Sequence, residues 1–391
     1  MPSCCPEAES FTIELNAGLH DRRLCPVSLT LSRDLPPGKT LQLCEEAPDG
    51  SCGAEVPVQY CGACSACGPA VALILAELPA GRTRRYRAHI VDAAARVAAP
   101  GVAVTAQPAG QVDFRVSGEP FTSYVHHTKV ARPYCYPVVG PGGVEMTNCG
   151  PADHVHHRSL YIAQGEVNGH DNWSELEGHA RTVNREIAIT SQGPVCGALV
   201  ARNDWVTAGG EPLLQERVRL TVWNLPAEHR LMDWDITWTA AYGGVFFGDT
   251  KEAGTLSVRV AEQLEARHTG LITNGYGGVT EAETWGRRAP WCDYSGTLKG
   301  QAVGLSIFDH PDNFRYPTYW HVRDYGLFTA NQWGLHGFTG DWSQRGDHAL
   351  PPGQSLHFQF RVFIHAGDVQ AARVADRFHD WAHPPHVTIA G

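Results

Sequence analysis

The feature that most constrains the fold is a long succession of short segments in which apolar and polar residues alternate. Examples are FTIEL from Phe11, RVRLTVW from Arg217 and SLHFQFRVFIHAG from Ser355. Alternation with a period of two is typical of strands with one buried face, and the Gly, Pro and Asp clusters between such segments predict turns. Since almost no segment has helical periodicity, we expect an all-β protein.

The chain has 391 residues, which exceeds one ordinary compact core, so two domains are expected. The small, polar stretch AQPAGQ, residues 106–111, is typical of a linker. We therefore expect a small antiparallel, Ig-like β-sandwich over residues 8–108 and a large antiparallel β-sandwich over residues 109–391. The segment VQAARVADRFHDWA, residues 369–382, has helical spacing and is followed by His-Pro-Pro, which predicts a C-terminal helix packed on a sheet.

The net charge of the chain argues against some classes of binding partner. A net charge of -10, from 31 Lys and Arg against 41 Asp and Glu, argues against nucleic acids and anionic membranes, which need a concentrated basic surface. The N-terminus shows no secretory signal, and no run of apolar residues is long enough for a membrane span. We expect a soluble, cytoplasmic protein with mostly reduced cysteines and a small-molecule partner.

The densest group of reactive side chains lies in DHVHHRSLYIAQGEVNGHDNW, which begins at Asp153. In an extended chain, His154, His156 and Arg158 share one face. Two such imidazoles can bind a metal ion or place a general base beside a cationic group, with Glu175 as a nearby carboxylate. The alternative is that these are hydrogen-bonded strand histidines without a chemical role.

A second group lies in IFDHPDNFRYPTYWHVRDYGLFTANQWG, residues 307–334. In an extended YWHVRDY, Tyr319, His321, Arg323 and Tyr325 share one face, which is unusual for a face that only meets water. The alternative is a solvated strand whose arginine pairs with an acid.

Aromatic residues beside fixed hydrogen-bond donors commonly hold sugar rings, because the ring covers the C–H face while polar groups bind the hydroxyls. Such residues occur in both groups and in the stretch YVHHTKVARPYCYPVVGPGG. The candidate substrate-binding residues are Arg132, Tyr134, Asn168, Trp173, Glu175, Asp293, Asp309, His310, Tyr319 and Asn331.

A cysteine cluster lies in the N-terminal domain. Cys61, Cys64 and Cys67, with Cys44 and Cys52 upstream, offer enough thiolates for a structural zinc ion, although two complete CxxC pairs are not present. The alternative is a loop of free or partly oxidised thiols. Because the cluster is distant in sequence from the histidines, it is not counted as catalytic.

Four motifs carry a family resemblance: RPYCYPVVGPGG, DHVHHRSLYIAQGEVNG, WGRRAPWCDYSG and FDHPDNFRYPTYWHVRDYGLFTANQWG. They resemble the bacterial PmoA-like family, labelled methane-oxygenase-like or of unknown function, and the resemblance covers nearly the whole chain. It implies a mutarotase-like supersandwich for the large domain and an association with sugar-processing enzymes. True particulate methane oxygenase subunits are membrane proteins, so the oxygenase label is not expected to describe this chain.

The chain departs from that family's pattern at three points. Val155 stands where the DHPHH run usually has Pro, and Cys135 stands where an aromatic residue is usual. The segment before Asp153 is short, which argues against a lid carried by that loop.

The first functional hypothesis is an enzyme that cleaves or isomerises a carbohydrate or an oxidised glycoside by general acid/base chemistry. The candidate catalytic residues are His154, His156, His157, Arg158, His321 and Arg323. His156 or His154 would be the base with His321 as its partner, and the two arginines would stabilise a developing oxyanion.

Three alternative functional hypotheses remain. One divalent metal ion, bound by His154, His156 and Glu175, would be a variant of the first hypothesis. A non-catalytic glycan-binding protein would use the same surface without turnover. A metal-dependent oxygenase would need an iron site with open coordination positions.

Overall fold

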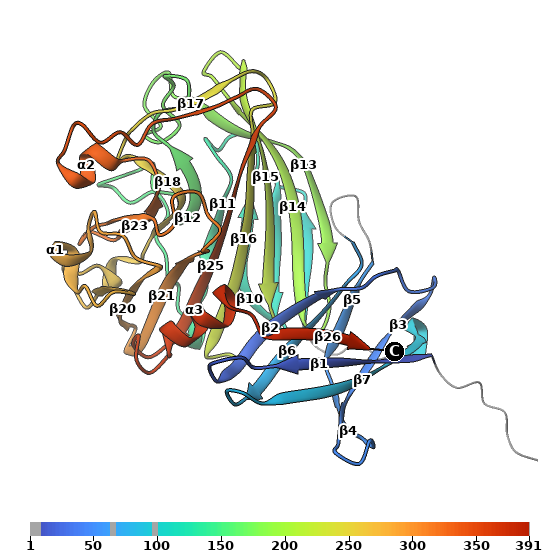
Figure 1. Cartoon of the computed structure of the whole chain (residues 1–391). Coiled ribbons are helices and arrows are strands. Elements are labelled where there is room, and N and C mark those ends of the chain that lie inside the picture. Colours follow the sequence, from blue (N-terminus) through green and yellow to red (C-terminus); the bar gives the residue numbers. More distant parts are fainter. Residues whose placement is uncertain (1–8, 63–67, 96–100, 391) are drawn as a thin grey trace, which may run out of the picture. The chain divides into compact units, whose positions relative to one another are not determined.

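The computed structural model describes residues 9–62, 68–95 and 101–390 (Figure 1). Strands dominate these residues, and the helices are short. The strands pair antiparallel, as β15 (Pro212–Trp223) does with β16 (His229–Thr239) along nine residues. The predicted all-β, antiparallel fold is confirmed. None of the described helices combines the length and the apolar composition that crossing a bilayer requires.

The chain divides into two compact units. The first contains residues 1–102, 191–196 and 375–391, and the second contains residues 103–190 and 197–374. The first unit has a five-stranded and a three-stranded sheet with a leucine- and valine-rich core. Their strands, in sheet order, are β26 (His386–Ala390), β1 (Ser10–Asn16), β7 (Thr83–Asp92), β3 (Lys39–Glu46) and β4 (Cys52–Val56), and then β2 (Arg22–Thr30), β6 (Ala70–Leu78) and β5 (Val58–Cys61).

The C-terminal helix is α3 (Val374–Ala382), so it begins later than the sequence pattern predicts. The chain then pairs β26 with β1, and the buried Asp380 carboxylate lies 3.6 Å from the Arg22 guanidinium. These contacts place the C-terminal residues in the first unit, whereas the sequence analysis grouped them with the large domain.

The second unit consists mainly of two eight-stranded sheets. The first has the order β22 (Tyr319–Val322), β23 (Leu327–Asn331), β18 (Ala253–Arg259), β12 (Leu160–Gln164), β11 (Tyr134–Val138), β10 (Glu119–Val125), β9 (Gln111–Val116) and β8 (Val102–Gln107). The second has the order β13 (Arg181–Ser191), β14 (Cys196–Val206), β15, β16, β25 (Ser355–Ala366), β21 (Gln301–Asp309), β20 (Trp291–Leu298) and β19 (Leu271–Asn274). The remaining elements are β17 (Val245–Phe247), β24 (His348–Leu350), α1 (Thr280–Thr284), α2 (Leu335–Thr339) and the short 3-10 turns η1 (Ala93–Ala95), η2 (Pro141–Gly143) and η3 (Glu262–Leu264).

Aromatic side chains fill the core of the second unit. The Trp238 ring packs on Phe247 and Trp333 with centroids 5.4 and 6.2 Å away. The buried Glu216 carboxylate accepts hydrogen bonds from the indole N–H groups of Trp205 and Trp238 at 3.2 and 2.9 Å. A buried acid is tolerated here because its oxygens are satisfied.

Candidate functional site

The histidine-rich segment is a loop of two consecutive turns in the second unit. The His154 N–H donates to the Pro151 carbonyl at 3.0 Å, and the His157 N–H donates to the His154 carbonyl at 3.0 Å. The expected extended conformation is therefore wrong for this segment. The turns instead stack the His154 and His157 rings, with centroids 4.6 Å apart, and expose Val155.

A buried arginine anchors this loop. Arg259 on β18 donates through Nη2 to Asp153 at 2.9 Å and to Glu265 at 2.9 Å, and its Nη1 lies 3.3 Å from Nδ1 of His157. A guanidinium only donates, so Nδ1 of His157 accepts and the ring is neutral. Burial, followed by the charges of His156, His154 and Arg259, lowers the pKa of His157 to about 2. His157 therefore positions the loop, and the catalytic role expected for it stays a prediction.

A second charge network flanks the loop. Arg132 is 1% exposed and donates to Glu175 at 2.8 Å and to the Trp173 carbonyl at 3.0 Å. Arg158 donates to both oxygens of the same carboxylate. Burial raises the pKa of Glu175, but the Arg158 hydrogen bond and the charges of Arg132 and Arg158 outweigh it, so the net shift is downward. Glu175 remains a carboxylate bound to two cations.

This network conflicts with the predicted metal ligands. Two guanidinium groups hold the Glu175 oxygens and would repel a cation. Among the described residues, Cys44, Cys52 and His89 place three possible metal-ligand atoms within 4.8 Å of one another. These three residues lie in the first unit. His154, His156 and Glu175 do not form such a set, and this prediction is corrected.

The structure brings the two sequence clusters together, although they are about 160 positions apart. Strands β22 and β23 are joined by a turn, in which the Arg323 N–H donates to the Leu327 carbonyl at 2.8 Å. The Tyr325 ring in this turn stacks on His154 at 4.8 Å. The Arg323 guanidinium lies over the rings of Tyr325 and Trp285, 5.6 and 6.0 Å from their centroids. The expected extended face therefore stops at Val322.

His321 on β22 is held in one tautomer. Its Nδ1 lies 2.6 Å from the Lys251 carbonyl oxygen, which only accepts, so Nδ1 carries the proton and Nε2 keeps its lone pair. Burial lowers the pKa of His321 to about 4, although the Lys251 hydrogen bond and the Glu252 charge act in the opposite direction. His321 is a neutral base at neutral pH.

Glu252 links the two histidines electrostatically. Burial, then the charges of Arg132 and His154, lowers the pKa of His156, whereas Glu252 raises it, as it does for His321. The Glu252 carboxylate accepts a hydrogen bond from Lys251 at 2.8 Å and is about half exposed. The sequence analysis missed it because the GDTKEAG turn matches no motif.

A polar row crosses the sheet below these groups. Strand register aligns His321, Thr329, Ser257, Tyr161 and Tyr134 on neighbouring strands. The Ser257 and Thr329 hydroxyls are 2.6 Å apart. The Tyr161 hydroxyl is fully buried and has no hydrogen-bond partner in the described part of the chain. The sheet thus offers polar groups directly beside the histidines.

Three predicted substrate-binding residues are sealed in the protein. Asp293, Asp309 and Asn331 are 0% exposed. The Asn331 side-chain amide donates hydrogen bonds to the Thr250 and Lys251 carbonyls. Burial raises the pKa of Asp309 to about 7, against hydrogen bonds from Asn313 and the Thr318 N–H. These side chains are closed off from solvent, and their roles in substrate binding stay predictions.

The other predicted residues are distributed around the site. Arg132 and Trp173 are buried, Tyr134 is half-buried, and Trp173 packs edge-on against His156 at 6.1 Å. Asn168 is exposed in a separate turn, where it donates to the Gly244 carbonyl at 3.4 Å. Their roles as substrate ligands remain predictions. His310 lies 3.6 Å from Asp312, and Tyr319 stacks on Phe338 at 5.4 Å.

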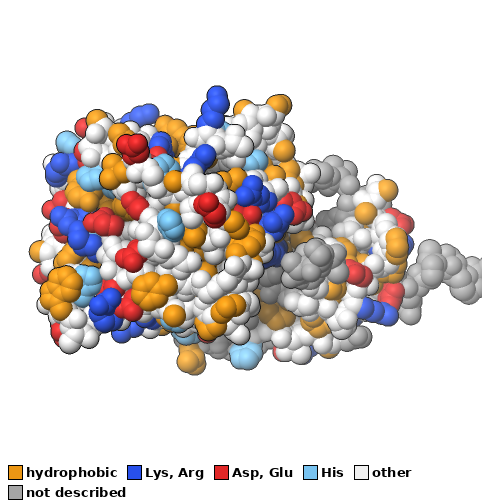
Figure 2. All heavy atoms as spheres, turned by 90° about the horizontal axis from the view of Figure 1, so that it is seen from above, with side chains coloured by type: hydrophobic (Ala, Val, Ile, Leu, Met, Phe, Trp, Pro, Cys, Tyr) orange, Lys and Arg blue, Asp and Glu red, His pale blue; other side chains and the backbone are white. Residues whose placement is uncertain are grey.

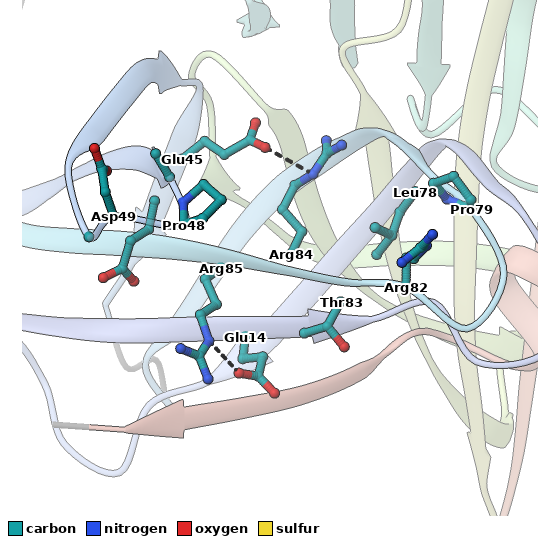
Figure 3. Close-up of a pocket in the computed structure, with 13 residues that line it drawn as sticks. Glu14, Glu45, Pro48, Asp49, Leu78, Pro79, Arg82, Thr83, Arg84 and Arg85 are labelled. Carbon is teal, nitrogen blue, oxygen red and sulfur yellow. Dashed lines mark hydrogen bonds and ion pairs between the residues drawn. The ribbon is translucent and has the colours of Figure 1, made fainter.

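One cavity lies beside the histidine-rich loop, and another lies in the first unit. A cavity of about 490 Å³ borders the loop and includes Asp153, Arg259 and Glu265 in its lining. A larger one of about 950 Å³ lies in the first unit, where Arg84 pairs with Glu45 and Arg85 with Glu14 (Figure 3). Its lining has no aromatic or histidine side chain, so it lacks the chemistry of the histidine site.

The fold and the site define a two-unit β-sandwich protein with a histidine, arginine and tyrosine site in its larger unit. Residues 111–379 match a family of unknown function, DUF6807, and the chain belongs to this family. No curated protein is significantly similar to it in sequence.

Several solved structures are distantly similar. A glycosyl hydrolase family 38 protein from Enterococcus faecalis is 10% identical, with a TM-score of 0.45 over 99% of this chain and 48% of that chain. An alpha-mannosidase from E. faecalis V583 is 10% identical, with a TM-score of 0.46 over 98% and 46%. A GalM/aldose epimerase homologue from C. elegans is 8% identical, with a TM-score of 0.32 over 69% and 100%. The chain spans about half the length of the first two.

Proposed function

We propose that this protein is an enzyme that acts on a carbohydrate or an oxidised glycoside by histidine-based acid/base chemistry. The observation that carries the proposal is the meeting of the two histidine- and arginine-rich segments, where the His154 and Tyr325 rings stack at 4.8 Å and the half-exposed Glu252 follows Lys251, whose carbonyl orients His321. Perturbed titratable groups around a common centre are typical of catalytic sites.

The chain's own groups suit proton transfer. The Lys251 carbonyl fixes the tautomer of His321, but this side chain is 1% exposed, so the half-buried His156 would be the imidazole that accepts a proton from a hydroxyl or from a carbon next to a carbonyl group. Glu252 stabilises the imidazolium that forms. The partly exposed Arg158 would stabilise the resulting oxyanion.

An exposed aromatic side chain supports a sugar as the substrate. Trp342 is 78% exposed, and its ring stacks on His336 at 4.4 Å. His336 pairs with the buried Asp249 at 2.7 Å. Because Asp249 is two residues before Lys251, the segment that orients His321 also supports an exposed aromatic platform for a sugar ring.

The surface composition agrees with a small, uncharged ligand. On the face in Figure 2, basic and acidic side chains are interspersed with histidine and hydrophobic ones. Neither sign of charge dominates that face, whereas binding to nucleic acids needs concentrated positive charge.

The PmoA-like resemblance is part of this proposal, but the methane-oxygenase label is not. Oxygen activation commonly uses iron held by histidines and a carboxylate. The carboxylate predicted as a ligand together with His154 and His156 is Glu175, which is bound to Arg132 and Arg158.

Turnover of a panel of sugars, glycosides and keto-sugars tests the proposal. We expect His156→Gln to reduce kcat/KM by about 10²–10⁴-fold on the substrate that reacts. The control is His357→Gln, at an imidazole that is half exposed and pairs with Asp235, which should leave turnover unchanged. Equal turnover by wild type and His156→Gln would contradict the proposal.

The pH profile provides a second test. The Glu252 charge favours the protonated form of both imidazoles. Glu252→Gln should therefore lower their pKa and move the acid limb of kcat/KM to lower pH. An unmoved acid limb would show that neither imidazole is the titrating base.

The alternative is a glycan-binding protein without catalysis, which the exposed Trp342 favours. In that case sugars bind without turnover, and Trp342→Ala weakens binding more than His156→Gln. The two functions are therefore separated by the same pair of variants.

A further inference from the structure

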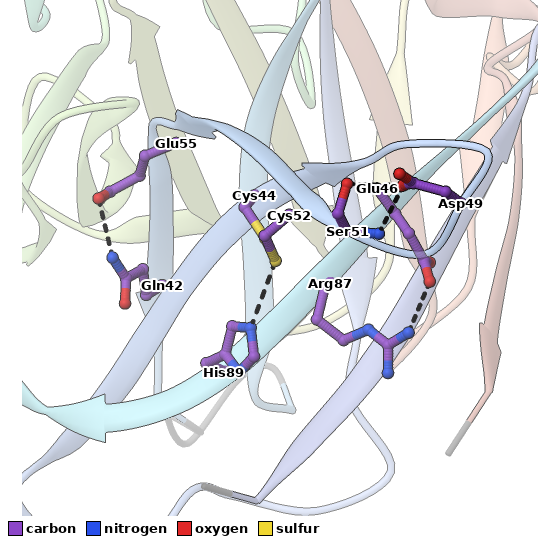
Figure 4. Close-up of a disulfide and its surroundings, with 9 residues drawn as sticks. All are labelled: Gln42, Cys44, Glu46, Asp49, Ser51, Cys52, Glu55, Arg87 and His89. Atoms are coloured by element: carbon purple, nitrogen blue, oxygen red, sulfur yellow. Dashed lines mark hydrogen bonds and ion pairs between the residues drawn. A yellow bond between two sulfur atoms is a disulfide. The ribbon is translucent and has the colours of Figure 1, made fainter.

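Two cysteines and a histidine meet on the five-stranded sheet of the first unit. Cys44 on β3 and Cys52 on β4 form a disulfide, with their Cα atoms 5.6 Å apart. Nε2 of His89 on β7 lies 3.7 Å from Sγ of Cys52 (Figure 4). The two sulfur atoms and this ring lie within 4.8 Å of one another.

The strand register explains the meeting. Cys44 lies opposite Arg87, and Gln42 lies opposite His89, on paired strands β3 and β7. Residues two apart on a strand share a face, so Cys44 and His89 emerge from the same side of the sheet as diagonal neighbours. Strand β4 then places Cys52 beside them.

The surroundings suit a cation. Cys44 is buried, but Cys52 is exposed and His89 is partly exposed, so an ion has a path from solvent. Arg87, which lies opposite Cys44 on β7, is paired with Glu46 at 2.6 Å. Glu55 lies opposite Cys44 in the register and accepts a hydrogen bond from Gln42 at 2.9 Å, so a negative charge is also present.

We propose that Cys44, Cys52 and His89 form a redox-gated zinc site. A dithiol reductant supplies two electrons and two protons, is itself oxidised to a disulfide, and opens the Cys44–Cys52 bond to two thiols. Zn²⁺ then displaces the two thiol protons and binds both sulfurs and Nε2 of His89, with water at the fourth position. The disulfide and the metal exclude each other because they use the same sulfur atoms.

This site differs from the zinc site expected from the sequence. Cys64 and Cys67 lie outside the described residues. Cys61 is on β5 in the other sheet of the unit, 3.3 Å from the Ser191 hydroxyl. The β3–β4 pairing, rather than the CGACSAC spacing, selects the ligands.

Metal titration of the full chain tests the proposal. Zn²⁺ and Co²⁺ are added to protein reduced with a phosphine and to protein oxidised beforehand, and bound metal is counted after gel filtration. We expect reduced wild type to bind one equivalent with sulfur-to-cobalt charge-transfer absorption. Cys52→Ser and His89→Ala should lose that equivalent, and oxidised wild type should not bind it.

Cys61→Ser is the matched control and should keep the equivalent. Far-UV circular dichroism establishes that each variant is folded, and His89→Ala leaves both cysteines in place if Cys52→Ser is unstable. Retention of the metal by both ligand variants, or equal binding by oxidised protein, would overturn the proposal. So would failure of reduced wild type to bind either ion.

Discussion

The larger unit contains two carboxylate–imidazole arrangements that the protein treats in opposite ways. In the first, Asp293 and His365 are both 0% exposed, and their atoms lie 2.9 Å apart. The Asp293 carboxylate also accepts hydrogen bonds from Ser295 and Ser306. In the second, Glu252 is about half exposed and influences both His156 and His321. The first arrangement is sealed, whereas the second combines a half-exposed carboxylate with one half-buried imidazole, His156, and one buried imidazole, His321.

The positions of the two arrangements in the fold account for this difference. Asp293 lies opposite Ser306, and His365 lies opposite Gly304, within paired strands of one sheet. His156 and Glu252 lie instead in turns, and His321 is on β22, the outermost strand of its sheet. Turns leave side chains accessible, whereas the interior of a packed sheet satisfies them internally.

The largest loss of stability should come from a substitution in the buried Asp293–His365 pair. Asp293→Ala leaves His365 and two serine hydroxyls without their acceptor, so we expect a loss of about 3–5 kcal/mol in the free energy of unfolding. Urea unfolding measures it. Glu252→Gln should cost about 1 kcal/mol or less, because its ion pair with Lys251 is exposed. Similar losses for both variants would remove the distinction between the two arrangements.

A loss of stability of intermediate size is expected when the pH is lowered. The unfolded state binds a proton near the ordinary histidine pKa, whereas the folded-state pKa of His157 is lowered to about 2. The unfolded state therefore binds more protons below about pH 6.5, and stability falls as the pH decreases. This histidine alone should cost about 2 kcal/mol between pH 7 and pH 5.

His157→Asn keeps an acceptor for Arg259 but does not titrate. Urea unfolding at both pH values should show a smaller pH-dependent loss in this variant than in wild type. An identical loss in the two proteins would mean that His157 is not held neutral in the fold.

The smallest effect concerns the loop itself. Val155 is 60% exposed and occupies the second position of the turn that the His157 N–H closes, where Pro is favoured. Val155→Pro should stabilise the protein by about 0.4–1 kcal/mol by restricting the unfolded chain. A lower thermal midpoint would show that the loop does not adopt this turn.

Much of the fold could be predicted from the sequence, because alternation of apolar and polar residues directly encodes strands with one buried face. The two histidine- and arginine-rich clusters were also visible as local patterns. Their detailed geometry was not, since alternation predicted an extended chain where backbone hydrogen bonds close two turns around His154. The local sequence pattern also does not reveal whether a side chain is buried, so Asp293 and Asp309 resembled ligand-binding residues.

The contacts that pattern reasoning missed join distant segments. Glu252 approaches His321 only because β18 and β22 belong to one sheet and its neighbour Lys251 contacts His321. His89 similarly approaches Cys44 and Cys52 only through the β3–β7 pairing.

Sugar-dependent stabilisation most directly tests the claim that the His156, His321 and Glu252 group is a ligand site. The thermal midpoint is measured for wild type, His156→Gln and the control His357→Gln, each with the same panel of sugars, glycosides and keto-sugars. We expect at least one compound to raise the midpoint of wild type and of the control, and to raise that of His156→Gln much less. Equal stabilisation of all three proteins, or none by any compound, would contradict the claim.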